Sequence, residues 1–266
     1  SSQGRENCVG AWDPPARREM SLGSVRCVVF DLDDTLWNAK HNLDAAHAAV
    51  RSELSRRCPE VGARFGEQAA FREEMRATMS EHPDRKHDFT FVRHTTLQRL
   101  TGSAEIATDM MDIWLQKRNR PELFPGALEA LKALHTSGVK IGTLTDGNAD
   151  PRSVDGLKDV VDFCVSSVEA GAAKPDRRAF ALCEERSGCT PEHLVMVGDN
   201  VEKDVLGAKA VGWRAIWVRP PRDGIALVGS ALDLSASAVV SEEQAREAAD
   251  ASVESVVDVA ADASVE

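Results

Sequence analysis

The sequence lacks the features by which membrane proteins and cysteine-stapled secreted proteins are recognised. Its 266 residues contain no apolar run of eighteen or more, and the N-terminal stretch holds no apolar segment such as a secretory signal needs. The six cysteines form no CxxC or CxxH pair, which disfavours a zinc site or a disulfide framework. We therefore expect a soluble intracellular protein with reduced cysteines and no membrane partner, in the cytoplasm or, as the alternative, in an organelle such as a plastid.

Positive charge is also in short supply. Lysine and arginine number 32 against 43 acidic residues, for a formal net charge of -11, so we expect no nucleic-acid partner. The acidity is uneven, because residues 221–266 carry ten acidic side chains against only Arg222 and Arg246. The body of the chain is therefore close to balance and need not repel an anionic ligand.

The chain divides into segments of different pattern. Residues 1–24 mix Ser, Gly, Arg and Pro without periodicity and predict a flexible leader. Short apolar runs alternate with helical patterns in 25–37 and 121–266, whereas 38–120 shows helical spacing alone. This predicts an α/β fold: a Rossmann-like core with a doubly wound parallel sheet, and a helical domain inserted after its first strand. For 222–266 two interpretations stay open, a partly disordered tail or a last short strand at 251–253.

The core pattern also places individual elements. Strands are predicted at 25–30, 139–144, 161–165, 194–197 and 215–218, and helices at 127–137, 177–186 and 201–211. In such sheets the loops at the carboxyl ends of the strands carry the chemistry.

Two carboxylates, Asp31 and Asp33, follow the first apolar strand in the segment DLDDT. In an extended segment both side chains project to the same side, so their like charges repel. A hard divalent cation between them would relieve the repulsion.

Further polar groups follow the other predicted strands. These are Thr145, Asp146 and Gly147 after the second, Lys174 in the next loop, and Gly198, Asp199 and Asp204 after the fourth. Together they supply a nucleophile, an acid, a hydroxyl, a cation and metal-binding carboxylates, which are the groups needed for phosphoryl transfer to a carboxylate.

These segments resemble the four motifs of the haloacid dehalogenase superfamily over roughly residues 25–220: DLDDT, TDGN from Thr145, KP at Lys174 and GDNVEKD from Gly198. The resemblance implies that Asp31 is the nucleophile and Asp33 the general acid and base. It implies that Thr145, the amides of Asp146 and Gly147, and Lys174 hold the phosphoryl group. It further implies a magnesium ion on Asp31, the main-chain carbonyl of Asp33 and Asp199, with Asp204 orienting a metal-bound water or Lys174.

The resemblance also indicates the class of reaction. Relatives that cleave carbon–halogen bonds lack an acid at the position of Asp33, so an aspartate there favours hydrolysis of a phosphomonoester through an aspartyl phosphate. A helical insertion after the first motif is typical of relatives that act on small soluble substrates. We expect a phosphatase whose partner is a small-molecule phosphate ester, as a monomer or homodimer. A catalytically silent binding module and a dehalogenase are the competing hypotheses.

Three segments carry the resemblance further: HDFTFVRHTTLQRL from His87, LTDGNADP from Leu144 and GWRAIWVRPPRDG from Gly212. They resemble phosphatases that act on FMN and on 5-amino-6-(5-phospho-D-ribitylamino)uracil, although Asp146 stands where Asn is common. This favours a substrate of riboflavin metabolism, with sugar phosphates, phosphoglycolate and nucleotides as alternatives. Candidates for substrate contact are Trp37, Arg93 and His94, whereas Phe89 and Phe91 are expected to pack inside the insertion.

Overall fold

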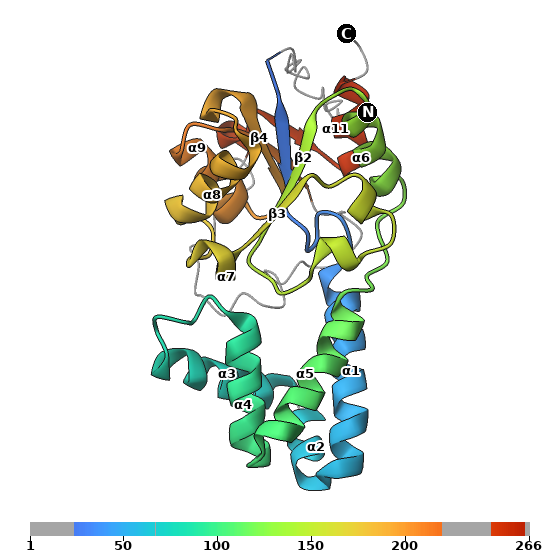
Figure 1. Ribbon diagram of the computed structural model, residues 1–266, viewed down its shortest axis with the longest axis vertical. Coiled ribbons are helices and arrows are strands. Elements are labelled where there is room, and N and C mark those ends of the chain that lie inside the picture. The colour runs from blue at the N-terminus through green and yellow to red at the C-terminus, as the bar shows by residue number, and fades with distance from the viewer. Residues whose placement is uncertain (1–23, 67, 220–245, 264–266) are drawn as a thin grey trace, which may run out of the picture.

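The computed structural model describes residues 24–66, 68–219 and 246–263, so most of the predicted leader and residues 222–245 lie outside the described chain. Within it, six parallel strands form one sheet in the order β3-β2-β1-β4-β5-β6 (Figure 1). The strands are β1 (Cys27–Phe30), β2 (Lys140–Thr145), β3 (Phe163–Ser166), β4 (Leu194–Gly198), β5 (Arg214–Val218) and β6 (Ala251–Val253). The predicted doubly wound parallel sheet is thus confirmed.

Helices cover both faces of the sheet, which is why its central strands are apolar on both sides. One face is covered by α6 (Ala127–Thr136) and α11 (Val256–Ala263), which pack side by side (Figure 1). The other is covered by α7 (Ser167–Ala170), α8 (Arg177–Ser187) and α9 (Gly207–Ala210). Short helical turns η1 (Pro151–Ser153), η2 (Leu157–Asp159) and η3 (Pro191–His193) lie in the connecting loops.

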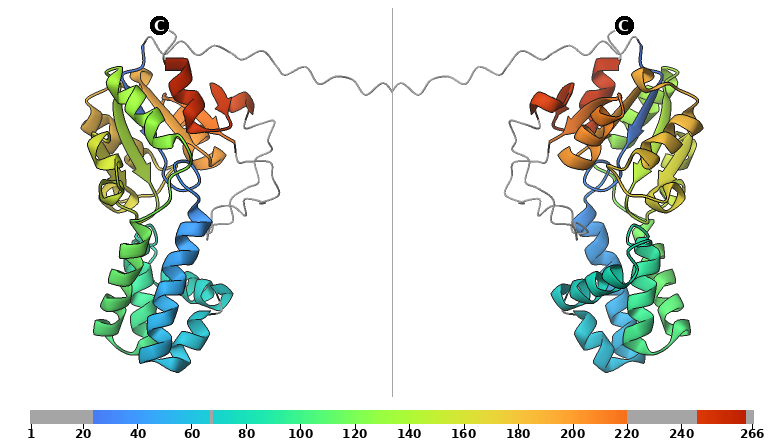
Figure 2. Two further views of the ribbon diagram at one scale, coloured as in Figure 1. Left: turned by 90° about the vertical axis from the view of Figure 1, so that its right-hand side faces the viewer. Right: turned by 90° about the vertical axis from the view of Figure 1, so that its left-hand side faces the viewer.

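Between β1 and α6, five helices form a separate group, here called the helical group. They are α1 (Ala39–Arg57), α2 (Pro59–Gly66), α3 (Gln68–Glu81), α4 (Phe89–Thr101) and α5 (Ala104–Arg118). Its apolar core is distinct from the two cores of the sheet, and it faces the carboxyl ends of the strands. The chain crosses between the two parts at the start of α1 and after α5 (Figure 2).

Local sequence explains where the helices of this group begin and end. The side chain of Asn38 accepts a hydrogen bond from the backbone N–H of His41 at the start of α1, and Asp88 and Ser103 cap α4 and α5 in the same way. Gly102 ends α4 with a left-handed backbone, which glycine adopts without a steric penalty.

The structure decides between the two interpretations of residues 251–253 and differs from the prediction in one helix. The last short strand at 251–253 forms as β6 and is followed by α11, so this part of the C-terminal segment is ordered. The helix predicted at 201–211 begins as a wider π-helical turn, η4 (Val201–Leu206), before α9. In η4, Asp204 is directed back toward the end of β4, where its carboxylate is bound.

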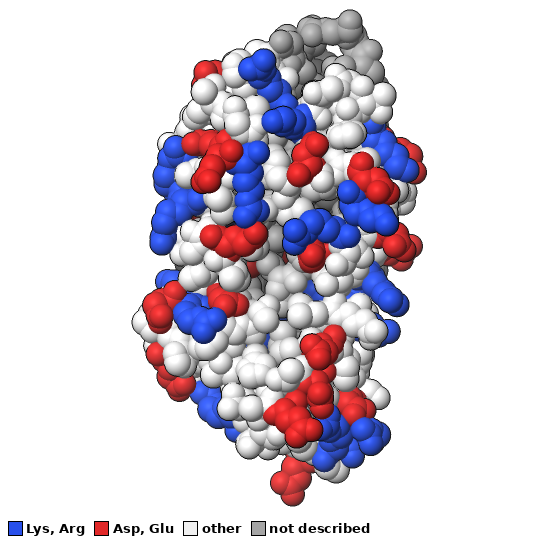
Figure 3. All heavy atoms as spheres, in the orientation of Figure 1, with Lys and Arg blue, Asp and Glu red and all other residues white. Residues whose placement is uncertain are grey.

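The surface is mixed in charge: acidic and basic side chains are interspersed over the face shown in Figure 3. None of the described helices is long and apolar enough to cross a membrane. The five described cysteines are free, as expected from their spacing.

Candidate active site

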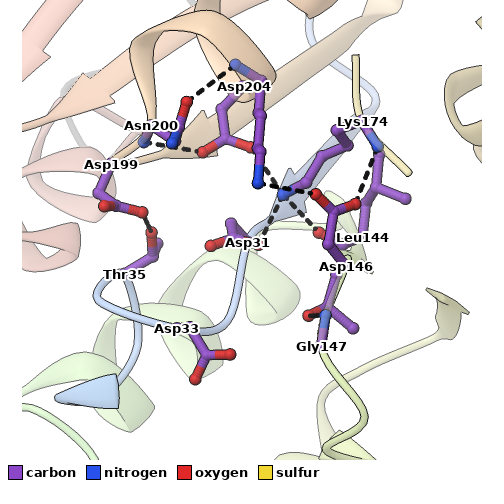
Figure 4. A network of polar contacts seen from close by, with 12 residues as sticks. Asp31, Asp33, Thr35, Leu144, Asp146, Gly147, Lys174, Asp199, Asn200 and Asp204 are labelled. Atoms are coloured by element: carbon purple, nitrogen blue, oxygen red, sulfur yellow. Dashed lines mark hydrogen bonds and ion pairs between the residues drawn. The ribbon is translucent and has the colours of Figure 1, made fainter. Parts of the chain in front are cut away.

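The predicted catalytic, phosphate-binding and metal-binding residues meet at the carboxyl ends of β1, β2 and β4, and Figure 4 shows most of them. The end of β1 places Asp31 in the middle, since its backbone N–H donates to the carbonyl of Val197 in β4 at 2.8 Å. Asp146 follows β2 on one side, and Asp199 follows β4 on the other. Residues far apart in the sequence are therefore gathered by the strand order alone.

Lys174 connects the carboxylates of this site. Its Nζ atom lies 2.6 Å from Oδ1 of Asp31 and 2.7 Å from Oδ1 of Asp204, and it donates to the carbonyl of Leu144 at 3.0 Å. Only 5% of the residue is exposed. All three hydrogen atoms of the ammonium group therefore have acceptors, and Lys174 is fixed beside the carboxylate predicted to be the nucleophile.

Burial and like charges control the protonation of these groups. Burial raises the pKa of Asp31, because the desolvated site disfavours a charge; Lys174 opposes this effect. Burial and the charge of Asp31 raise the pKa of Asp199 well above its usual range. Burial alone would lower the pKa of Lys174, but Asp204 and Asp31 raise it well above its usual range. The site therefore holds a stable cation beside carboxylates that repel one another.

The carboxylates fit a divalent metal ion. Asp31, Asp199 and Asp204 each offer an oxygen atom, and these atoms lie within 4.8 Å of one another. Hard oxygen donors of this kind suit Mg²⁺. Asp204 is already engaged, since its second oxygen accepts the N–H of Asn200 at 3.0 Å. The arrangement therefore favours Asp31 and Asp199 as ligands and Asp204 as the residue that holds Lys174.

Two glycines are required by close packing at the site. A Cβ atom on Gly198 would meet the carboxylate of Asp204 at 2.2 Å, and one on Gly147 would meet an oxygen of Asp33 at 3.0 Å. The backbone N–H of Gly147 donates to Oγ1 of Thr145 at 3.0 Å. Thr145 and the following amides thus form a compact turn beside Asp31 and Asp33.

Asp33 has partners that the sequence analysis did not predict. Nε1 of Trp37 donates to one of its oxygens at 2.9 Å, and the guanidinium of Arg118 donates to the other. Arg118 is fully buried and also binds Oδ1 of Asn42. Trp37 precedes α1 and Arg118 ends α5, so Asp33 is held from both crossings between the sheet and the helical group. No local pattern marks Arg118, because its partner lies 85 residues away in the chain.

A pocket opens between the strand ends and the helical group. Its lining includes every predicted catalytic, phosphate-binding and metal-binding residue: Asp31, Asp33, Thr145, Asp146, Gly147, Lys174, Asp199 and Asp204. It also includes five residues without a predicted role in the site: Ala39, Leu43, Phe89, Asn200 and Lys203. Two of these, Asn200 and Lys203, lie inside the GDNVEKD segment, so their position in the motif could have marked them. Phe89 packs partly within the helical group, as expected, but also faces the pocket.

The three candidates for substrate contact lie elsewhere. Trp37 is fully buried, and its indole is used by Asp33. Arg93 is buried on α4, with its guanidinium 3.5 Å from the ring centroid of Trp114. His94 is half-buried on α4, and its Nε2 atom lies 3.2 Å from Oγ1 of Thr108 on α5. None of the three lines the described pocket, to which α4 contributes Phe89.

Comparison with known proteins identifies the class of this fold and site. A family model described as a haloacid dehalogenase-like hydrolase matches residues 25–212. The chain therefore belongs to the haloacid dehalogenase-like hydrolases, in agreement with the resemblance of its four motifs.

The curated relatives include phosphatases. The phosphoserine phosphatase of Thermus thermophilus is 34% identical over 126 residues, which cover 46% of this chain and 51% of that protein. The 5-amino-6-(5-phospho-D-ribitylamino)uracil phosphatase YigB of Escherichia coli is 24% identical over 207 residues, covering 75% of this chain and 85% of the relative. The chain thus spans about half the length of the first relative and most of the second.

The fold resembles solved structures over nearly its whole length. A 2-haloacid dehalogenase from Pseudomonas syringae pv. tomato DC3000 superposes with a TM-score of 0.72 at 25% identity, covering 90% of this chain and 98% of that one. Phosphatases and dehalogenases share this fold, so the site residues have to decide between the two reactions.

Proposed function

We propose that the protein is a magnesium-dependent phosphatase that hydrolyses a small phosphomonoester through a phosphorylated Asp31. The observation that carries this proposal is that two carboxylates with different partners meet in one pocket. Lys174 contacts Asp31, whereas Arg118 and Trp37 hold Asp33. Carboxylates in different surroundings are suited to different roles in one reaction.

The residues support a two-step reaction. Asp31 attacks the phosphorus atom, while Lys174 and the backbone amides after Thr145 stabilise the charge on the phosphoryl oxygens. Asp33 gives a proton to the leaving oxygen and later removes one from the water that hydrolyses the aspartyl phosphate. When bound at Asp31, Asp199 and the carbonyl of Asp33, Mg²⁺ would supply positive charge that neutralises the phosphate.

The helical group is proposed to act as a cap over the strand ends. Its α1 and α4 contribute Leu43 and Phe89 to the pocket, opposite the catalytic carboxylates. An apolar and aromatic wall of this kind would exclude bulk water from the phosphorylated enzyme. We keep the domain division predicted from the sequence, with 38–120 as the cap and 25–37 and 121–266 as the core.

The favoured substrates are FMN and 5-amino-6-(5-phospho-D-ribitylamino)uracil. The segments from His87, Leu144 and Gly212 support this choice, as does the relative YigB. Phe89 offers the ring system a stacking surface at the pocket wall. Sugar phosphates, phosphoglycolate and nucleotides are the alternatives.

The proposal is tested with a panel of phosphate esters, p-nitrophenyl phosphate and a 2-haloacid, each with Mg²⁺ or with EDTA. We expect Mg²⁺-dependent phosphate release that is lost in Asp31→Asn, by at least about 10⁴-fold, because the nucleophile is removed. Phosphate release that survives Asp31→Asn would reject the mechanism. Halide release without phosphate release would identify a dehalogenase, and no turnover at all would favour a binding module. Equal rates on flavin-pathway and sugar phosphates would reject the favoured substrates only.

A further inference from the structure

Asp146 occupies an unusual electrostatic position in the pocket. One of its oxygens accepts the backbone N–H of Lys174 at 2.8 Å. The other, Oδ2, is buried and has no hydrogen-bond partner among the described residues. A buried carboxylate oxygen without a donor is costly, and here it lies beside the turn proposed to hold a phosphate dianion.

Lys203 is the cation nearest to that oxygen. Its Nζ atom lies 3.5 Å from Oδ2 of Asp146, and the two side chains are 21% and 13% exposed. Lys203 comes one residue before Asp204 in η4, so the same wide turn that brings Asp204 to Lys174 also brings Lys203 to Asp146, the residue that follows β2. At 3.5 Å the pair is too long for a good hydrogen bond, and a partly exposed pair of this kind adds little stability.

The charges that line the pocket make Lys203 significant. Five carboxylates line it, namely Asp31, Asp33, Asp146, Asp199 and Asp204, and Lys174 and Lys203 are the two cations among the described lining residues. Lys174 is already shared by Asp31 and Asp204. Lys203 is thus the cation whose charge is available to balance Asp146.

We propose that Lys203 and Asp146 are a matched pair in which the lysine cancels the carboxylate charge beside the phosphate-binding turn. The phosphoryl group then approaches the amides of Asp146 and Gly147 without repulsion from the Asp146 side chain. This inference rests on the proposed function and names the pair that sets affinity for the phosphoryl group. The affinity for phosphate then depends on both residues together. With only one of them present, the charge beside the phosphate-binding turn is no longer balanced.

A double-mutant cycle tests the pairing. The four proteins are wild type, Lys203→Met, Asp146→Asn and the double variant, and the probe is inorganic phosphate with Mg²⁺, measured by titration calorimetry. We expect Lys203→Met to weaken phosphate binding at least about tenfold in the wild type, because a desolvated carboxylate is then left beside the anion. In the Asp146→Asn background the same change should weaken binding about threefold or less. Lys203→Arg should retain most of the affinity.

Asp146→Asn keeps an oxygen that can accept the Lys174 N–H, and Lys203 is partly exposed, so both changes should leave the melting temperature close to wild type. An effect of Lys203→Met on phosphate binding that is equal or larger in the Asp146→Asn background, or absent from both backgrounds, would overturn the pairing.

Turnover of p-nitrophenyl phosphate by wild type is recorded in parallel. Coupled phosphate binding without turnover would reject the proposed function and leave the pairing standing, whereas turnover without coupling would do the reverse.

Discussion

The sheet and the helical group each bury a cation, and the two cations have opposite surroundings. At the strand ends, Lys174 is 5% exposed and contacts the carboxylates of Asp31 and Asp204. In the helical group, Arg93 is 4% exposed and lies over the ring of Trp114, and no described carboxylate forms an ion pair with it. Its Nε atom has no hydrogen-bond partner among the described residues.

The difference shows that burial of a cation does not by itself indicate an active site. The carboxylates beside Lys174 raise its pKa well above the usual range despite burial. Burial lowers the pKa of Arg93 to about 9, and the nearby charge of Arg118 acts in the same direction. The charge of Lys174 is thus held by its partners, whereas the charge of Arg93 is opposed by its surroundings. Arg118 stands between the two cases, since it is fully buried but binds one carboxylate, Asp33.

Removing the cation from the strand ends should have the largest effect. In Lys174→Met, Asp31 and Asp204 lose their shared partner and the phosphoryl group loses a neutralising charge. We expect kcat/KM for p-nitrophenyl phosphate to fall by about 10³-fold and the free energy of unfolding to fall by about 3 kcal/mol. Lys209→Met is the matched control, because Lys209 pairs with Asp250 at the surface. A Lys174→Met protein with activity like that of the control would remove the basis of the comparison.

Arg118, the intermediate case, should affect only the step in which the leaving group takes up a proton. In Arg118→Met, one oxygen of Asp33 loses the donor that holds it in place. Asp33 is the proposed general acid, so its position matters when the leaving oxygen requires a proton. We expect turnover of an alkyl phosphate to fall by about 10²-fold, while p-nitrophenyl phosphate, whose leaving group needs no proton, should lose less than about fivefold. Steady-state rates on both esters, with melting temperatures, provide the measurement. An equal loss on both esters would mean that Arg118 supports the fold rather than Asp33.

Arg93, the buried cation of the helical group that has no described carboxylate partner, should have the smallest effect on catalysis. In Arg93→Met a charge without a carboxylate partner is replaced by an apolar side chain. We expect kcat/KM within about threefold of wild type and a free energy of unfolding about 1 kcal/mol higher at pH 7.5. The folded-state pKa of Arg93 lies below its value in the unfolded chain, so the cost is complete below about pH 9 and declines as the pH rises above it. The stability difference between the two proteins should therefore shrink from pH 7.5 to pH 10.

Denaturant unfolding of both proteins at the two pH values measures this difference. A rise in KM for Arg93→Met without a stability change would restore Arg93 as a substrate contact. A stability loss at pH 7.5 would show that the cation–π contact with Trp114 outweighs the cost of burial.

The sheet was predictable because each core strand is a short apolar run followed by polar residues. For the same reason, the positions of Asp31, Thr145 and Asp199 at the strand ends followed from the sequence, and the structure places all three at the pocket. The π-helical start of η4 was not predictable, because in it Asp204 contacts Lys174, which comes from another segment of the chain. Local periodicity carries no record of such contacts.

The lining from the helical group was harder to predict. Arg93 and Phe89 lie four residues apart on α4, so helical spacing places them on one side of the helix without telling which one reaches the pocket. In the structure Phe89 lines the pocket, whereas Arg93 is buried inside the helical group against Trp114. Trp37 and Arg118 act on Asp33 from the two crossings between the parts, which only the tertiary arrangement brings together.

The central place of β1 in the sheet also bears on synthesis of the protein. β1 is made before the other strands but lies between β2 and β4, so Asp31 gains Asp199 and Asp204 only after the ribosome has delivered β4 and the turn beyond it. Domains fold largely as units during synthesis, and contacts across such sequence distances form late. A nascent chain that ends before β4 therefore lacks Asp199 and Asp204 and has no complete pocket. The pocket proposed to bind the phosphate ester is therefore complete only when nearly the whole core has been synthesised.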